Sequence, residues 1–229
     1  MPIINLVYEA PSGWWGWQPW ANTLFYYKFE NNLLNEVTWT VDASFNWSWS
    51  YDTIWWVQCV NLNNTWISLT AKLPANDFTL CRYGNFISFN NNSFNWIFWI
   101  TWIYSGGIHC QFQNDVSGGI WPCLNIYNYW TEQWSSVAIS NGYTTGQWYC
   151  YALVRDSWVC TLYVNWVSEA SMTIWGNNSQ SRQYYLWEAY NSDRYYHGYM
   201  SNAILENVAW TQQEVTNYYN STKWDYWIS

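Results

Sequence analysis

Charge is scarce in this sequence, and positive charge is the scarcest. Only 10% of the 229 residues are charged, and seven Lys and Arg against fifteen Asp and Glu leave a formal net charge of −8. The basic residues are scattered along the chain. Phosphate backbones and anionic membrane surfaces both select clustered basic residues. The sequence therefore argues against nucleic acid and charged membranes as partners.

Long apolar runs are also lacking. No stretch approaches the roughly 20 apolar residues of a membrane-spanning helix. The opening MPIINLVYEA has no positively charged start, and its apolar run is too short for a signal peptide. We expect neither membrane insertion nor an export signal in this chain.

The cysteines lack the spacing of metal and redox motifs, because no two of them form Cys-x-x-Cys. Most lie in apparent strands, where cysteine behaves as a small buried hydrophobe. We predict free, buried thiols, and three disulfides are the alternative that an even number allows. The six are Cys59, Cys81, Cys110, Cys123, Cys150 and Cys160.

Strand patterns are abundant, most clearly between Gln147 and Trp166. Aromatic and β-branched residues alternate there with period two, break at Arg155 to Trp158, and resume from Val159 to Val164. This pattern is typical of two strands joined by a tight turn. Similar runs recur along the chain, and 229 residues suit one sandwich domain. The sequence predicts an all-β domain.

Four segments carry recognisable motifs. The central hairpin reads W-x-x-x-A-L-V-R-D and then L-Y-V-N-x-V, Thr23 to Glu30 reads as an opening strand, and His197 to Glu206 as a closing strand. Thr211 to Glu214 then forms a capping box that begins a helix. Together these motifs resemble laminin-G-like domains of the concanavalin A-like lectin and glucanase superfamily.

The resemblance implies a two-sheet antiparallel jelly-roll sandwich with a short C-terminal helix, in which the first strand pairs with the last. We expect residues 1–22 to be an arm and linker, residues 23–223 the sandwich, and residues 224–229 a tail. The resemblance also implies non-catalytic recognition of carbohydrate or another cell-surface ligand, although fold alone does not fix function.

Catalytic motifs are absent. Many β-glucan hydrolases of this superfamily carry Glu-x-Asp-x-Glu on one strand, which places the carboxylates on one face. That spacing does not occur here, nor do the nucleophile-elbow, P-loop or His-Glu-x-x-His motifs. The two histidines, His109 and His197, are expected to be packed rather than catalytic. We predict no enzyme activity, with a glycoside hydrolase built from acids assembled by folding as the lesser alternative.

A sugar site needs aromatic faces that stack on sugar C–H groups and amides that fix the hydroxyls. Both occur around one predicted strand, in which Asn125, Tyr127 and Tyr129 share a face. The alternative is that these aromatics belong to the sandwich core. The predicted ligand-binding residues are Trp121, Asn125, Tyr127, Asn128 and Tyr129, and Tyr184 to Tyr196 is a second candidate face.

Some members of the family bind calcium through carboxylates and carbonyls at the sandwich rim. Asn114 and Asp115, on a predicted loop, are the candidate calcium ligands, and an ordinary Asx turn is the competing interpretation. We predict no other cofactor.

The missing export signal, the N-terminal arm and the linker favour a second function from another class. In this alternative the domain is a structural or decoration domain of a virion, appendage or surface layer. We expect an extracellular or virion-associated protein, whose partners are glycans or the proteins of its own assembly.

Glycine is scarce while tryptophan is abundant, at 11 and 24 residues. Ordinary usage of about 7% would give roughly 16 glycines. Trp166 follows Asn165 in a predicted two-residue hairpin loop, and a type I′ turn there requires positive φ at both positions. We hypothesise that many of these tryptophans are glycine in the native protein, through a UGA codon read with the wrong table; a genuinely Trp-rich lectin is the alternative.

The glycine hypothesis predicts strain at Trp166 that Trp166→Gly would relieve. It exempts Trp148 and Trp210, which stand where the family often has an aromatic or apolar residue. The other suspected positions are Trp14, Trp15, Trp17, Trp20, Trp39, Trp47, Trp49, Trp55, Trp56, Trp96, Trp99, Trp102, Trp187, Trp224 and Trp227.

Overall fold

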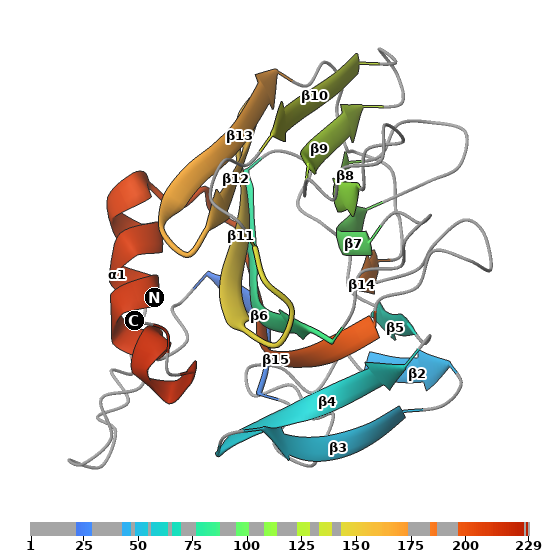
Figure 1. Ribbon diagram of the computed structural model, residues 1–229. Coiled ribbons are helices and arrows are strands. Elements are labelled where there is room, and N and C mark those ends of the chain that lie inside the picture. Colours follow the sequence, from blue (N-terminus) through green and yellow to red (C-terminus); the bar gives the residue numbers. More distant parts are fainter. Residues whose placement is uncertain are drawn as a thin grey trace, which may run out of the picture.

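The computed structural model describes residues 22–28, 43–46, 49–54, 56–63, 66–69, 77–87, 95–100, 108–113, 123–128, 133–138, 143–173, 184–186, 197–226 and 228. These residues form two antiparallel sheets and one short C-terminal helix, which confirms the predicted sandwich. Figure 1 shows helix α1 (Gln212–Thr222) on one side of the first sheet and the second sheet on the other.

The first sheet, sheet A, holds the central hairpin. Its strands run in the order β13 (Val167–Thr173), β12 (Val159–Val164), β11 (Trp148–Asp156), β6 (Phe78–Phe86), β15 (His197–Glu206), β4 (Val57–Asn63) and β3 (Trp49–Ile54). The opening strand β1 (Thr23–Tyr27) pairs with the closing strand β15, as the family resemblance implies.

The second sheet, sheet B, has the order β10 (Gln133–Ala138), β9 (Cys123–Asn128), β8 (Ile108–Gln113), β7 (Asn95–Ile100), β14 (Tyr184–Leu186), β5 (Trp66–Leu69) and β2 (Ala43–Asn46). All its pairings are antiparallel. In Figure 1 these strands follow one another from β10 to β2 along the side of the molecule away from α1.

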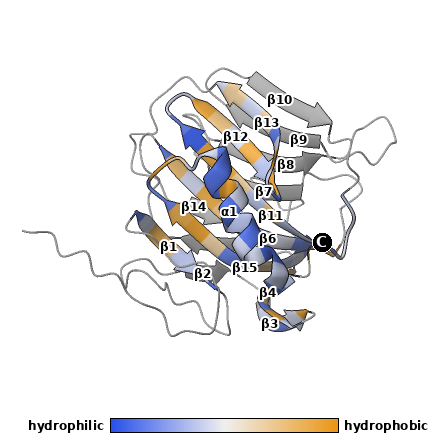
Figure 2. Cartoon of the chain, turned by 90° about the vertical axis from the view of Figure 1, so that its left-hand side faces the viewer, coloured by the Kyte–Doolittle hydropathy of each residue, from blue (hydrophilic) through white to orange (hydrophobic). Residues whose placement is uncertain are grey.

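Helix α1 begins at the predicted capping box. The Thr211 hydroxyl accepts the Glu214 N–H at 3.3 Å, and the Thr211 N–H donates to Glu214 Oε2 at 2.7 Å. Val215, Tyr218 and Tyr219, one helical face, are buried against sheet A. Figure 2 shows α1 in front of the middle strands of that sheet. The helix is thus fixed by its cap and by one apolar face.

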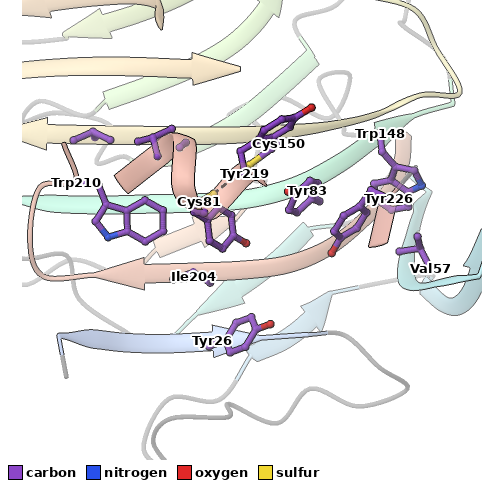
Figure 3. Packing of buried hydrophobic residues seen from close by; sticks show 14 of the residues in the cluster. Tyr26, Val57, Cys81, Tyr83, Trp148, Cys150, Ile204, Trp210, Tyr219 and Tyr226 are labelled. Carbon is purple, nitrogen blue, oxygen red and sulfur yellow. Dashed lines mark hydrogen bonds between the residues drawn. The ribbon is translucent and has the colours of Figure 1, made fainter. Parts of the chain in front are cut away.

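Aromatic packing ties the C-terminus to sheet A. A short 3₁₀ helix, η1 (Lys223–Tyr226), follows α1 and buries Tyr226. The rings of Tyr226 and Tyr83 are stacked, with centroids 3.6 Å apart and an interplanar angle of 7°. Trp148 lies beside Tyr226, with centroids at 5.3 Å, and Figure 3 shows the three rings together. This packing extends the hydrophobic core beyond the helix itself.

The four cysteines whose side chains are described, Cys59, Cys81, Cys150 and Cys160, are free and buried, as predicted. Burial raises the pKa of Cys59 and of Cys160 to about 12. The Sγ atoms of Cys81 and Cys150 lie 3.6 Å apart as thiols. Register pairs Cys81 with Ala152, so Cys150 is its diagonal neighbour, at a separation that suits a disulfide poorly.

The hairpin loop at Asn165 and Trp166 differs from the prediction. Val164 and Val167 are partners, so the loop does have two residues. Asn165 has φ 49°, as expected, but Trp166 is not among the described residues with positive φ. The prediction of strain at Trp166 is therefore wrong, because Asn, which tolerates the left-handed region, carries the positive φ.

The six tryptophans whose side chains are described divide by exposure. Trp148 and Trp210, the two exempted from the glycine hypothesis, are buried. Trp158 and Trp166 in hairpin loops, Trp224 and Trp56 are exposed, the last by 86%. Trp56 has φ 76° in the two-residue loop between the partners Ile54 and Val57. It is the described tryptophan that occupies a backbone conformation suited to glycine.

Candidate carbohydrate-binding face

The predicted binding strand lies inside sheet B, between β8 and β10. Asn125 is paired with Gln111 of β8 and with Ser136 of β10. Tyr127 is paired with His109 and Trp134 of the same two strands. Directly opposite residues of antiparallel strands share a face of the sheet. Asn125 and Tyr127 therefore lie on one face, together with these four partners.

The same face continues across β7 and β14. Trp99 is the partner of His109, Tyr185 is the partner of Trp99, and Trp96 is the partner of Gln111. We call this the ring-and-amide face. It comprises Trp96, Trp99, His109, Gln111, Asn125, Tyr127, Trp134, Ser136 and Tyr185.

The opposite face of sheet B is mostly apolar. Its residues include Ala43, Phe45, Ile67, Leu69, Phe98, Ile100, Ile108, Cys110, Phe112, Leu124, Ile126, Val137 and Leu186. A sheet with one apolar and one polar face is typical of antiparallel sheets that cover a core and leave one side in water. The pattern favours the apolar face as the one toward sheet A, and the ring-and-amide face as the outer one.

The predicted site residues divide between the two faces. Asn125 and Tyr127 share the ring-and-amide face, whereas Asn128, paired with Ile108 and Gln133, falls on the opposite face. Trp121, Tyr129, Asn114 and Asp115 lie outside the described residues, as does most of Tyr184 to Tyr196. His109 and Gln111 join the face although the sequence did not predict them there. Their period-two spacing in β8 shows that they share a face, but only the register joins it to Asn125 and Tyr127.

One acidic residue has a strongly raised pKa, and it lies in sheet A rather than on this face of sheet B. Burial raises the pKa of Glu206 to about 7, while the hydroxyl of Thr23, which donates to Oε1, lowers it and the nearby Glu214 carboxylate raises it. Glu206 is fully buried at the end of β15. A catalytic acid must reach a substrate, so this carboxyl is structural.

No metal centre appears among the described residues, because no three or more of their His, Cys, Asp and Glu side chains come close enough to hold an ion. Within the same residues, no helix has the length and hydropathy to cross a membrane.

The sequence matches no protein-family model and no curated protein. The structure, however, is similar to solved structures. Domain 4 of AbnA, an extracellular arabinanase of family GH43 from Geobacillus stearothermophilus, solved in complex with arabinotriose, matches with a TM-score of 0.70 at 16% identity, over 86% of this chain and 98% of that domain. The chain therefore shares the β-sandwich fold of this domain.

Two toxin domains share the same fold. The binding domain of Paraclostridial Mosquitocidal Protein 1 matches with a TM-score of 0.68 at 13% identity, over 87% of this chain and 52% of that one. The receptor-binding domain of botulinum neurotoxin D matches with a TM-score of 0.67 at 11% identity, over 88% and 53%. The chain thus spans about half the length of these two structures. Both of these neighbours are named as binding domains.

Proposed function

We propose that this protein is a non-catalytic carbohydrate-recognition domain that binds glycans on the ring-and-amide face of sheet B. The register of sheet B carries this proposal. It gathers aromatic and amide residues of three strands around Asn125 and Tyr127, and it assigns the apolar residues to the opposite face.

The residue types on this face match the chemistry of sugars. Aromatic rings provide flat apolar surfaces for sugar C–H groups, and amides offer both donors and acceptors to hydroxyls. The acidic net charge and the scarcity of basic residues disfavour phosphate-rich ligands. Support also comes from two structural neighbours. AbnA domain 4 was solved in complex with arabinotriose, and the cell entry of botulinum neurotoxin type C depends on interaction with two ganglioside molecules.

We further propose that the domain belongs with the laminin-G-like domains, that it spans residues 23–223, and that it acts outside the cell. The pairing of β1 with β15 and the capped C-terminal helix support this assignment. The extracellular arabinanase domain of the same fold supports the location.

A glycan array probed with the purified chain tests the proposed function. The array should carry arabino-oligosaccharides, β-glucan oligosaccharides and ganglioside glycans. Saturable binding to at least one class is the expected result, and incubation with the bound glycan should release no smaller sugars. Binding to none of the glycans would refute the proposal, and turnover of a bound β-glucan would replace it with a glycoside hydrolase.

A further inference from the structure

A single row of ring-bearing residues crosses sheet B from β10 to β14. Successive partners in this ring row are Trp134 with Tyr127, Tyr127 with His109, His109 with Trp99, and Trp99 with Tyr185. Each of the five adjacent strands contributes one ring. The row beside it, through Ser136, Asn125, Gln111 and Trp96, is mainly polar. Apart from Trp96, the rings and the polar side chains therefore fall into two parallel rows.

The ring row runs across the strands and is long. Neighbouring strands lie about 4.8 Å apart, so the four intervals between β10 and β14 span about 19 Å. Along any one of these strands the same face offers few rings. In β8 it carries His109, Gln111 and Gln113, and in β9 it carries Cys123, Asn125 and Tyr127. Strand β7 has two rings on this face, Trp96 and Trp99. A ligand that meets more than two consecutive rings must therefore lie across the strands.

The described strands place no charged residue on this face. None of the residues that the register of the described strands places there is Asp, Glu, Lys or Arg. A charged sugar, such as a uronic acid or a sialic acid, would find no fixed countercharge on these strands, and it would meet an acidic protein overall. A neutral sugar needs no countercharge, so the absence of charged residues does not weaken its binding.

We propose that the ring row is a linear binding site, which we call the binding line, for a neutral, unbranched glycan chain. The glycan chain lies across β10, β9, β8, β7 and β14, with the amides of Asn125 and Gln111 beside it. The inference rests on the proposed function and narrows its ligand to internal stretches of a linear chain. One sugar unit covers only part of the row, so each further unit adds contacts until the row is filled. A terminal sugar or a branch point does not gain contacts in this way as the glycan becomes longer.

Titration calorimetry with two oligosaccharide series tests this inference. The probes are arabinose to linear arabinohexaose and glucose to cellohexaose. The dissociation constant for one series should fall by at least about tenfold from disaccharide to hexasaccharide. Trp134→Ala and Tyr185→Ala, at the two ends of the row, should weaken hexasaccharide binding more than disaccharide binding. Trp158→Ala, which removes an exposed tryptophan from a hairpin of sheet A, is the matched control and should change neither.

The outcomes separate the two proposals. Equal affinity at all lengths, or equal weakening of short and long chains by the end variants, would overturn the binding line and leave carbohydrate recognition standing. Binding of branched, terminal or sialylated glycans on the array, with binding of neither linear series, would overturn the binding line in the same way. Failure to bind any glycan would refute both proposals. Unfolding midpoints of the variants, equal to that of the parent, exclude misfolding as the cause.

Discussion

Tyr127 of β9 and His109 of β8 are direct partners across two antiparallel strands, and Asn125 and Gln111 are the next partners on the same face. This block of four residues is the centre of the proposed binding face. Each member comes from a strand position whose neighbours in sequence belong to the opposite face. Substitutions can therefore test one face against the other within a single strand.

Replacing Tyr127 or Asn125 by Ala should weaken glycan binding by about tenfold, which corresponds to about 1.4 kcal/mol of lost contact. Asn128→Ala removes an amide from the same strand but from the opposite face, so it should leave the affinity of the folded protein unchanged. Titration calorimetry with the best array ligand measures all three. Loss of binding in Asn128→Ala without loss of stability would contradict the proposal, because it would place the site on the opposite face of sheet B.

Glu206 should make stability depend on pH. Its pKa is about 7 in the folded protein against an ordinary value of 4.5, so folding favours the protonated form. The contribution of protonated Glu206 to the free energy of unfolding is fully present below about pH 4.5. It is lost as the pH rises to about 7, and the loss amounts to up to about 3 kcal/mol. Urea unfolding at pH 5 and pH 8 should show the protein more stable at pH 5, after correction for other groups.

Glu206→Gln is the matched variant for this pH effect. Its amide oxygen can still accept the hydrogen bond from the Thr23 hydroxyl, but it does not ionise. The variant should gain stability at pH 8 relative to the parent and lose most of the difference between the two pH values. An unchanged pH difference would show that Glu206 is not its source.

Gly198 should tolerate no side chain. A Cβ atom at this position of β15 would collide with the carbonyl oxygen of Asn85 and lie 2.9 Å from Cα of Phe86. Both obstacles are backbone, so Gly198→Ala should cost about 3 kcal/mol or more. Gly146→Ala is the control, because nothing lies within 4 Å of its Cβ and only its φ of 81° is unfavourable. That variant should cost about 1 kcal/mol, and equal losses would contradict the steric argument.

Trp56 and Trp166 should respond in opposite ways to glycine. Trp56→Gly should stabilise the protein by about 1 kcal/mol, because a left-handed conformation costs a non-glycine residue about 1–2 kcal/mol. Trp166→Gly should destabilise it, because the Trp166 ring packs on Tyr219 with centroids 4.5 Å apart. Chemical unfolding measures both. Destabilisation by Trp56→Gly would remove the backbone argument for glycine at that position.

The coding DNA tests the glycine hypothesis independently. UGA at most of the 24 Trp codons, with an intact mass of the native protein that fits glycine, would support it; UGG and a mass that fits tryptophan would refute it. The codon at position 99 also decides whether the ring row includes a ring from β7, because Trp99 is among the suspected positions. Tyr127, His109 and Tyr185 remain in the row in either case.

The hairpin and the helix could be predicted because their signals are local. Period-two alternation identifies β11 and β12, and the capping box identifies the start of α1. Strand β10, with the sequence QWSSVA, escapes prediction because its own pattern is weak and it is held by pairing with β9. Strand β6 (Phe78–Phe86) also gives a weak signal in the sequence. It is buried along its whole length, so it lacks alternation.

The candidate site was predictable in part for the same reason. Alternation alone groups Asn125 with Tyr127, and it would also have excluded Asn128. The partners His109 and Gln111 depend on register, and a slip of one residue would exchange the faces. No local pattern in the sequence sets the register between β8 and β9.

The most direct test of the central claim is to map glycan contacts by NMR on ¹⁵N-labelled protein, titrated with the best array ligand. The account predicts that the perturbed backbone amides cluster in β7, β8, β9 and β10, around His109, Gln111, Asn125 and Tyr127. Perturbations confined to α1 and sheet A would contradict it, because the ligand would then bind on the other side of the sandwich.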